Sequence, residues 1–349
     1  MRWISPRAPV LLFVIAAAMA WGSTANAHEK WFHDDPAKYP SRLDQVTQPM
    51  TLGFIAATVV TVGVLGLIWR AVREREVLPG PADFGADEEG RSLLYGLVPA
   101  ILGLHVATPL LVNALHGDLF SPNNSLTGVW KYWLGLMQVG AALSFFYGGL
   151  TRPAAAFLAL TWLVGCVAVG LEPMLENIHY LGFAAFFWLA GRGPFSIDRL
   201  LMPKFAPSDA SMRLAMPALR TGVALSLIAV AFTEKLANRP LALSFLKTYD
   251  LNFTGYLGIP MSDEVFVLCA GSVELLVGLC LLFGIFTRLI ILIAWLPFNL
   301  TLTVFNWVEL AGHLPYYGAL AVLMVWTASD EEQRLFIRGL KLKPRPALP

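Results

Sequence analysis

An all-helical fold that crosses a membrane several times is predicted by three features of this sequence. Only 14% of the 349 residues are charged, whereas about 25% are charged in an ordinary soluble domain. Hydrophobic residues make up 56% of the chain. They gather in runs close to the length of about 20 residues that a membrane-spanning helix needs. A soluble globular fold is therefore excluded, and membrane lipid is the first expected partner.

The charge balance and the cysteines narrow the remaining function classes. The net charge is +1 and no basic tract is long enough to follow a phosphate backbone, which excludes nucleic acid as a partner. Cys166, Cys269 and Cys280 all lie in apolar runs without a Cys-x-x-Cys pair, so we expect buried thiols rather than a redox dithiol. Quinone, ions, small molecules and other proteins remain as candidate ligands or partners.

Residues 1–27 are typical of a secretory signal peptide. Two arginines near the start precede an apolar stretch from Val10 to Trp21, and small residues follow up to Ala27. We expect cleavage after Ala27, because the apolar stretch is short for a membrane span; the alternative is an uncleaved extra helix. In both cases residues 28–50 form an extracytoplasmic segment.

Nine further apolar runs predict nine transmembrane helices in the mature chain. The runs cover residues 51–69, 93–115, 129–150, 153–171, 177–191, 214–234, 263–286, 289–307 and 315–328. Residues 51–92 then hold the first helix and a solvated cytoplasmic linker. Residues 331–349 form a basic cytoplasmic tail.

The lysine and arginine positions provide an independent test of this topology. A chain that starts outside and crosses nine times ends inside, and basic residues should gather in its cytoplasmic loops. They do so in three groups: Arg70, Arg73 and Arg75; Arg192, Arg199, Lys204 and Arg213; and Arg334, Arg338, Lys341, Lys343 and Arg345. The pattern predicts a bacterial inner (plasma) membrane protein with its mature N-terminus extracytoplasmic and its C-terminus cytoplasmic.

An internal repeat divides most of the chain into two units. Residues 147–152 match residues 283–288 in their Gly, Thr and Arg, and the same offset aligns Gln138 with Glu274 and Tyr180 with Tyr316. The repeat predicts two four-helix units, 93–200 and 213–330. An even number of crossings separates them, so both have the same orientation in the membrane.

These repeated segments resemble the DoxX-like family of integral membrane proteins. The resemblance rests on Gly258–Pro260, Gly271–Gly278 and Leu282–Arg288 in the second unit, and on Glu176, Tyr180–Gly182 and Gly191–Asp198 in the first. It implies tandem four-helix bundles behind one additional helix. It also implies similarity to the membrane subunit of a thiosulfate:quinone oxidoreductase. Gln138 departs from the glutamate that the family has at this place.

Carboxylates and imidazoles at the outer ends of the predicted helices are candidate metal ligands. Glu172, Glu176 and His179 are spaced by four and three residues, which gathers them on one face if the helix is continuous. Glu309 and His313 lie at the equivalent edge of the second unit. This ligand set suits iron, copper or zinc. The alternative interpretation is that these residues are polar caps at helix ends.

The mature N-terminus offers a second candidate metal site. After cleavage at Ala27, the terminal amine and the imidazole of His28 could chelate copper, and His33 could add a third nitrogen. Trp31 and Phe32 favour the alternative, in which this segment is an aromatic anchor at the membrane surface.

Two ionisable residues inside predicted spans are candidate catalytic groups. Glu274 is the deepest acidic residue, and Gly271 and Gly278 lie on its helix face, which indicates a close helix contact. Protonated Glu274 would line a quinone or proton pathway, and Lys235 or Arg239 could neutralise it. His105 lies mid-span and needs a partner, either a hydrogen-bond acceptor on a neighbouring helix or a metal, haem or quinone.

Two functions are compatible with these residues. The first is an enzyme subunit linked to quinone, in which the outward polar or metal cluster exchanges electrons with a membrane quinone and a redox partner subunit. The second is a transporter, receptor or assembly factor for a small molecule, metal or partner protein, without an enzymatic step.

Overall fold

The computed structural model describes residues 29–32, 35–302, 305 and 307–342. All regular elements within these ranges are helices, and strand-like pairing there is limited to one isolated bridge between Asp118 and Ser125. The prediction of an all-helical fold is therefore confirmed. The signal segment, His28 and His33 lie outside the described residues.

Among the described residues, six helices are long and apolar enough to cross a membrane. They are α3 (Pro49–Ala71), α4 (Glu88–His116), α6 (Thr151–Ala168), α10 (Asp209–Val230) continued by the π-helical turn η5 (Ala231–Leu236), α12 (Asp263–Phe283) and α14 (Trp307–Val325). Each of them overlaps one of the nine predicted apolar runs.

The other three predicted runs also fall on helices, but these are shorter or less apolar. They are α5 (Gly128–Tyr147), α8 (His179–Ala190) and α13 (Thr287–Leu302). At about 1.5 Å rise per residue, a 12-residue helix such as α8 is shorter than the roughly 30 Å hydrocarbon core. The count of nine crossings stays a prediction.

Helix α3 shows why a membrane setting suits this chain. Its large apolar side chains point outward, with Val60 64% exposed and Leu67 67% exposed. Soluble monomers rarely expose continuous apolar patches above a few hundred Å². Lipid is the solvent that such a helix surface requires.

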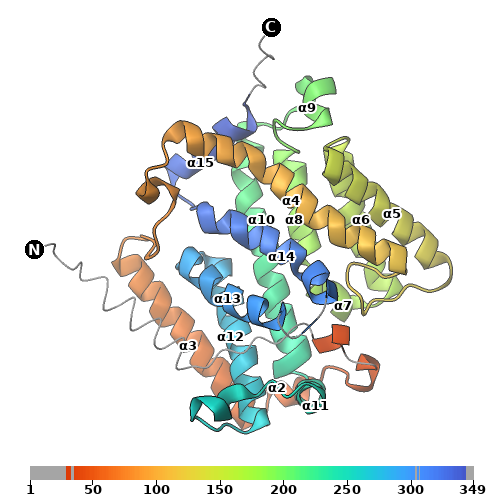
Figure 1. The fold of residues 1–349 in the computed structure, drawn as a ribbon, viewed down its shortest axis with the longest axis vertical. Coiled ribbons are helices and arrows are strands. Elements are labelled where there is room, and N and C mark those ends of the chain that lie inside the picture. Colours follow the sequence, from red (N-terminus) through yellow and green to blue (C-terminus); the bar gives the residue numbers. More distant parts are fainter. Residues whose placement is uncertain (1–28, 33–34, 303–304, 306, 343–349) are drawn as a thin grey trace, which may run out of the picture. The chain divides into compact units, whose positions relative to one another are not determined.

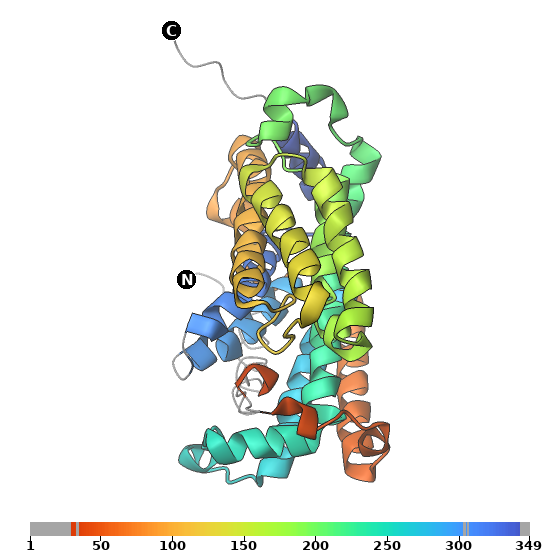
Figure 2. The same cartoon turned by 90° about the vertical axis from the view of Figure 1, so that its right-hand side faces the viewer.

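The described chain forms two compact units. Unit one takes residues up to 78 and 227–306, where α3 and α13 pack on α12, and α11 (Arg239–Thr248) lies at one end of α12 (Figure 1). Unit two takes residues 79–226 and 307 onward. In it α4 packs on α5, α14 and α15 (Asp330–Leu340), and α6 lies between α5 and α8 (Figure 2).

These units do not follow the predicted repeat boundaries of 93–200 and 213–330. Helix α14, expected in the second repeat, belongs to unit two. The repeated motif nevertheless adopts the same turn at both places. Gly148 and Gly284 have φ of +70° and +68°, Leu150 and Phe286 also have positive φ, and a threonine starts the next helix each time.

Both repeated turns also receive a carboxylate at the start of the following helix. Asp198 accepts hydrogen bonds from the backbone N–H of Leu150 at 2.6 Å and of Thr151 at 2.8 Å. Glu76 accepts one from the backbone N–H of Arg288 at 3.3 Å. Acidic groups are favourable there because a helix N-terminus carries free N–H groups and partial positive charge.

Two predicted helix starts were wrong. Helix α14 begins at Trp307 and passes through Pro315, where we expected it to begin, because a proline is tolerated inside a membrane helix when neighbours satisfy the freed carbonyl. Helix α4 begins at Glu88 rather than at 93. Asp87 caps it by accepting a hydrogen bond from Gly90 N–H at 2.7 Å, so this end of the predicted linker is helical.

Helices α8 and α10 of unit two cross at a pair of glycines. A Cβ atom added to Gly182 would lie 2.8 Å from Gly222 Cα, and one added to Gly222 would lie 2.5 Å from Gly182 Cα. Small residues permit such close backbone approach in membrane bundles.

We expect Gly182→Ala to lower the free energy of unfolding by about 1 to 3 kcal/mol, because the added methyl group overpacks a backbone contact. Gly140→Ala on α5 is the matched control, since nothing lies within 4 Å of a Cβ there. Thermal unfolding in detergent measures both variants. Equal melting temperatures would show that the crossing tolerates wider spacing.

Candidate functional site

A small cavity of about 180 Å³ lies in unit two, between the end of α4 and the start of α14. We call it the outer pocket. Asn113, His116 and Asp118 supply its polar groups, and Trp307 lines it with small apolar residues. A mostly apolar pocket with a few convergent polar groups is the usual form of a small-molecule site.

His116 is held in one orientation by its own helix. Its Nδ1 lies 2.9 Å from the carbonyl oxygen of Val112, so in the neutral ring Nδ1 carries the proton and donates it to that carbonyl. The remaining nitrogen, Nε2, then carries a lone pair. The Trp307 ring centroid lies 6.0 Å from that of the imidazole, at a tilt of 32°.

The loop that carries Asp118 is shaped by Gln138. Gln138 accepts a hydrogen bond from Phe120 N–H at 3.0 Å and donates one to the Asp118 carbonyl at 2.9 Å. Asn113 Nδ2 donates to the Phe120 carbonyl at 2.7 Å. Gly117 has φ of +85°, and a Cβ on it would lie 2.5 Å from Lys131 Cε. Gln138 thus holds a loop and is not an acid or base.

Burial changes the acidity of Asp118. The loss of hydration raises the pKa of this carboxyl above its ordinary value of 3.8, against the opposing effects of the Ser125 hydroxyl and nearby cations. Ser125 Oγ donates to Asp118 Oδ1 at 2.8 Å. A raised pKa brings the carboxyl closer to exchanging protons at working pH, which is common at functional sites.

A row of polar side chains lies along α14, beginning in its first turn. Glu309 Oε1 lies 3.1 Å from His313 Nδ1, and both side chains are almost completely buried. Tyr316 continues the row, with its ring centroid 6.0 Å from that of His313. Glu309 lies in the first turn of α14, which begins at Trp307, and His313 lies one turn further along the helix.

Ser226 on α10 joins this row to His179. Its hydroxyl oxygen lies 2.7 Å from the Tyr316 hydroxyl and 2.9 Å from His179 Nδ1, and it donates to the Glu176 carbonyl. The single hydroxyl proton of Ser226 goes to that carbonyl, which can only accept. Tyr316 and His179 Nδ1 therefore both donate to Ser226, which leaves the lone pair of a neutral His179 on Nε2.

The predicted metal cluster does not assemble in the described part of the chain. Glu172 and Glu176 lie on the short helix α7 (Leu171–Glu176), whereas His179 starts α8, so the continuous helix that would align them is broken. No three His, Cys, Asp or Glu side chains among the described residues are close enough to hold a metal ion. Iron or copper ligation by Glu172, Glu176, His179, Glu309 and His313 therefore lacks a supporting geometry.

His105 finds its partner on its own helix. Its Nδ1 lies 2.8 Å from the Ile101 carbonyl, and a Cβ added to Gly318 on α14 would lie 2.6 Å from His105 Cβ. The prediction of a partner on a neighbouring helix was wrong for this nitrogen. His105 therefore packs in the contact between α4 and α14.

In unit one, Glu274 forms the ion pair that the sequence suggested. Lys235 Nζ lies 2.9 Å from Glu274 Oε1 and 4.0 Å from Glu234 Oε2, and Lys235 is fully buried. Gly271 permits this approach, since a Cβ there would lie 3.0 Å from Lys235 Cβ. The role of Glu274 in a quinone or proton pathway stays a prediction. Lys235 lies in η5, and π-helical turns are frequent at functional sites.

Comparison of the chain with protein-family models, curated proteins and solved structures found no match. The resemblance to DoxX-like proteins therefore stays a prediction from the repeated motifs.

Sequence reasoning missed Asp118 and Ser226. Asp118 follows an apolar run and resembles an ordinary loop carboxylate, and Ser226 is one of many small residues in a span. The Gly117-Asp118 turn was a usable signal for a loop that folds back on α4. No local signal distinguishes Ser226, because its partners lie 47 and 90 residues away.

Asp118 should make stability depend on pH. Its pKa is raised on folding, so it contributes stability below its ordinary pKa of 3.8 and loses that contribution as the pH rises through the folded-state pKa. We expect the melting temperature of the wild type to fall relative to that of Asp118→Asn as the pH rises above the ordinary pKa of 3.8. If the melting temperatures of the two proteins change equally with pH, the prediction is wrong.

Glu274→Gln should lower the free energy of unfolding by about 3 kcal/mol, because it leaves a buried ammonium without its nearest carboxylate. Lys235→Met/Glu274→Gln removes both charges but also takes Lys235 away from the buried Glu234, so it should recover only part of the loss. Glu264→Gln is the control: its pair with Arg239 at 2.7 Å is half-exposed and should cost below about 1 kcal/mol. Equal losses for Glu264→Gln and Glu274→Gln in thermal unfolding would refute the ranking.

Proposed function

We propose that this chain is a quinone-linked redox subunit and that the outer pocket binds the quinone headgroup. The observation that carries the proposal is the convergence of His116, Asp118 and Trp307 on one small cavity at the end of membrane-crossing helices. At about 180 Å³ the cavity is below the roughly 300 Å³ of drug-sized sites, so it suits a single ring whose isoprenoid tail stays outside.

The polar groups of the outer pocket match what a quinone requires. Quinone carbonyls accept hydrogen bonds, and reduction to the quinol takes up two electrons and two protons. A protonated Asp118, which its raised pKa favours, can donate a proton, and His116 Nε2 can exchange one. The electrons would come from a redox partner subunit, as the family resemblance implies. No metal-dependent step is part of the proposal.

The arrangement in the membrane is part of the same proposal. With an extracytoplasmic mature N-terminus and nine crossings, the outer pocket, His179 and Glu309 all lie near the extracytoplasmic surface of a bacterial inner membrane. The distribution of lysine and arginine supports this orientation. The repeated Gly-x-x-Thr-Arg turn, with the same backbone geometry in both copies, supports a tandem DoxX-like organisation.

One observation favours a second function, proton- or ion-coupled transport. The buried Lys235–Glu274 pair beside the π-helical turn η5 places two charges inside the helices of unit one. Intramembrane charge pairs of this kind often belong to ion pathways. Flux of protons or a small ion into vesicles, without a redox change of added quinone, would favour transport over the quinone-linked function.

Quinone binding to the purified protein tests the first function. We expect short-chain ubiquinone or menaquinone to quench tryptophan fluorescence with saturation. His116→Gln should weaken the affinity by roughly three- to tenfold, because one hydrogen bond contributes roughly 0.5 to 1.5 kcal/mol. His105→Gln is the matched control, since His105 bonds to its own helix. Weakening by His105→Gln alone would instead favour the mid-span site, and no saturable binding would refute the proposal.

A further inference from the structure

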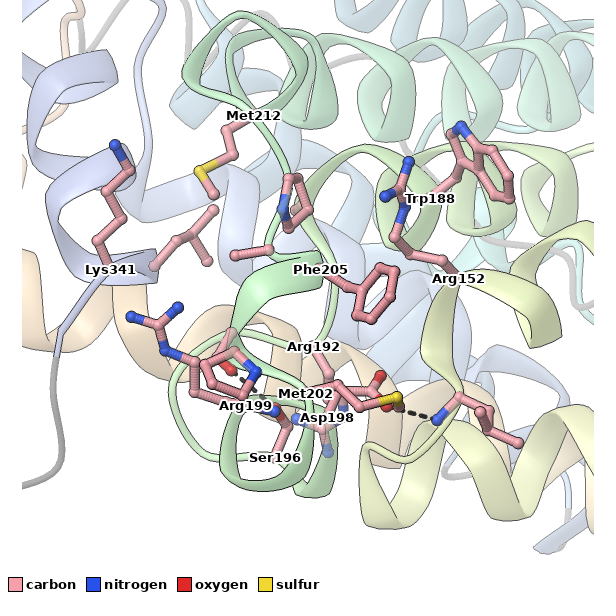
Figure 3. A pocket seen from close by; sticks show the side chains of 18 of the residues that line it. Arg152, Trp188, Arg192, Ser196, Asp198, Arg199, Met202, Phe205, Met212 and Lys341 are labelled. Atoms are coloured by element: carbon pink, nitrogen blue, oxygen red, sulfur yellow. Dashed lines mark hydrogen bonds between the residues drawn. The ribbon is translucent and has the colours of Figure 1, made fainter.

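A second and larger cavity lies in unit two, at the other end of α5 and α6. Its volume is about 430 Å³ (Figure 3). The start of α6, the end of α8, α9 (Ile197–Leu201) with the segment after it, and the end of α15 line it. We call it the basic pocket. The quinone-linked function does not use it.

Cations dominate the charge of the basic pocket. Its lining has four basic side chains, Arg152, Arg192, Arg199 and Lys341, and one acidic side chain, Asp198. Lys341 is also paired with Asp209, which lies outside the lining, so the arginines carry the uncompensated charge. Asp198 is engaged with the backbone N–H groups at the start of α6. Asp198 thus balances only part of the positive charge of the pocket lining.

The arginines lack carboxylate partners. Arg192 is 95% buried and donates from Nε and Nη2 to backbone carbonyls, while no acceptor in the described part of the chain lies within hydrogen-bonding distance of its Nη1. Burial lowers the pKa of Arg192 to about 10, so it remains charged at neutral pH. Arg152 lies over the Trp188 ring, 4.7 Å from its centroid, as Figure 3 shows. Within the described residues, neither Arg152 nor Arg199 forms a salt bridge.

An apolar groove continues from the basic pocket. It runs between α5 and α6, has a volume of about 610 Å³, and is lined almost entirely by apolar side chains such as Leu136 and Phe157. Leu150 and Pro153 line both cavities. The basic pocket therefore adjoins an apolar groove between α5 and α6 that suits a lipid acyl chain.

We propose that this composite cavity is a binding site for an anionic phospholipid. The headgroup phosphate lies in the basic pocket near Arg152 and Arg199, and one acyl chain lies in the groove between α5 and α6. Membrane cations interact with anionic headgroups in this way, and Trp188 and Phe205 provide the amphipathic rim common at membrane surfaces. The proposal depends neither on quinone chemistry nor on which leaflet faces the site.

Native mass spectrometry of the full chain in detergent, after delipidation, tests the site. Added phosphatidylglycerol should be retained in a 1:1 complex at concentrations where phosphatidylcholine is not. Arg152→Gln/Arg199→Gln should weaken phosphatidylglycerol binding by about 25-fold, about fivefold for each arginine, as expected for cations beside an anionic headgroup. Arg213→Gln/Lys204→Gln removes the same charge from the same region outside the pocket lining and should leave binding unchanged.

The groove has its own variant. Nothing lies within 4 Å of a Cβ on Gly140, which lines the groove, so Gly140→Leu can fill it without a clash. We expect Gly140→Leu to weaken phosphatidylglycerol binding at least fivefold. Arg152→Lys, which keeps the charge, should retain most of the binding and shows that the folded pocket tolerates substitution there.

Three results would overturn the proposal. Equal retention of phosphatidylcholine and phosphatidylglycerol would mean an ordinary annular lipid. Equal weakening by the control pair would mean a diffuse surface charge effect. If inorganic phosphate alone binds the wild type with saturation, and Gly140→Leu does not change the retention of phosphatidylglycerol, the site is one for a free anion.

Discussion

The close crossing of α8 and α10 is the constraint on which the buried hydrogen bonds around Ser226 depend. Gly182 and Gly222 let the two backbones touch. Ser226 lies one turn beyond Gly222, and His179 lies one turn before Gly182, so the crossing brings their side chains to 2.9 Å. A larger residue at either glycine would separate the helices and leave three polar groups without the Ser226 hydroxyl. Buried polar groups require such partners because no water reaches them.

Buried charged side chains of this chain need partners for the same reason. Lys235 is neutralised by Glu274 across two helices of unit one, and Arg91 pairs with Glu332 in unit two at 2.5 Å. Arg192 is different, since its donors meet backbone carbonyls of α4 and α5. The carbonyls of Phe145 and Phe146 lie at the end of α5 and that of Ala100 lies within α4, and none of the three carries a full negative charge. Arg192 therefore keeps its net positive charge, and it lines the basic pocket beside Arg152 and Arg199.

Unit two thus presents two cavities of different chemistry on one helical frame. Between the end of α4 and the start of α14, the outer pocket combines an imidazole, a carboxyl group with a raised pKa and an indole ring. At the start of α6 and the end of α8, the basic pocket combines arginines with an adjoining apolar groove. The two cavities therefore differ in charge: the first has one carboxyl group and one imidazole, and the second is lined mainly by arginines.

The sequence by itself determined the helices and their environment, because a backbone in hydrocarbon must satisfy its hydrogen bonds within each segment. It also identified the repeated turn after Tyr147 and Phe283, and it offered Lys235 as one of two cations that could neutralise Glu274, since these follow from local pattern and depth. Only the tertiary structure decided the sites. Gln138 folds the Asp118 loop onto α4, Ser226 reaches His179 across 47 residues, and the break between α7 and α8 separates Glu172 and Glu176 from His179. Such contacts depend on how distant helices pack, and no local pattern encodes that packing.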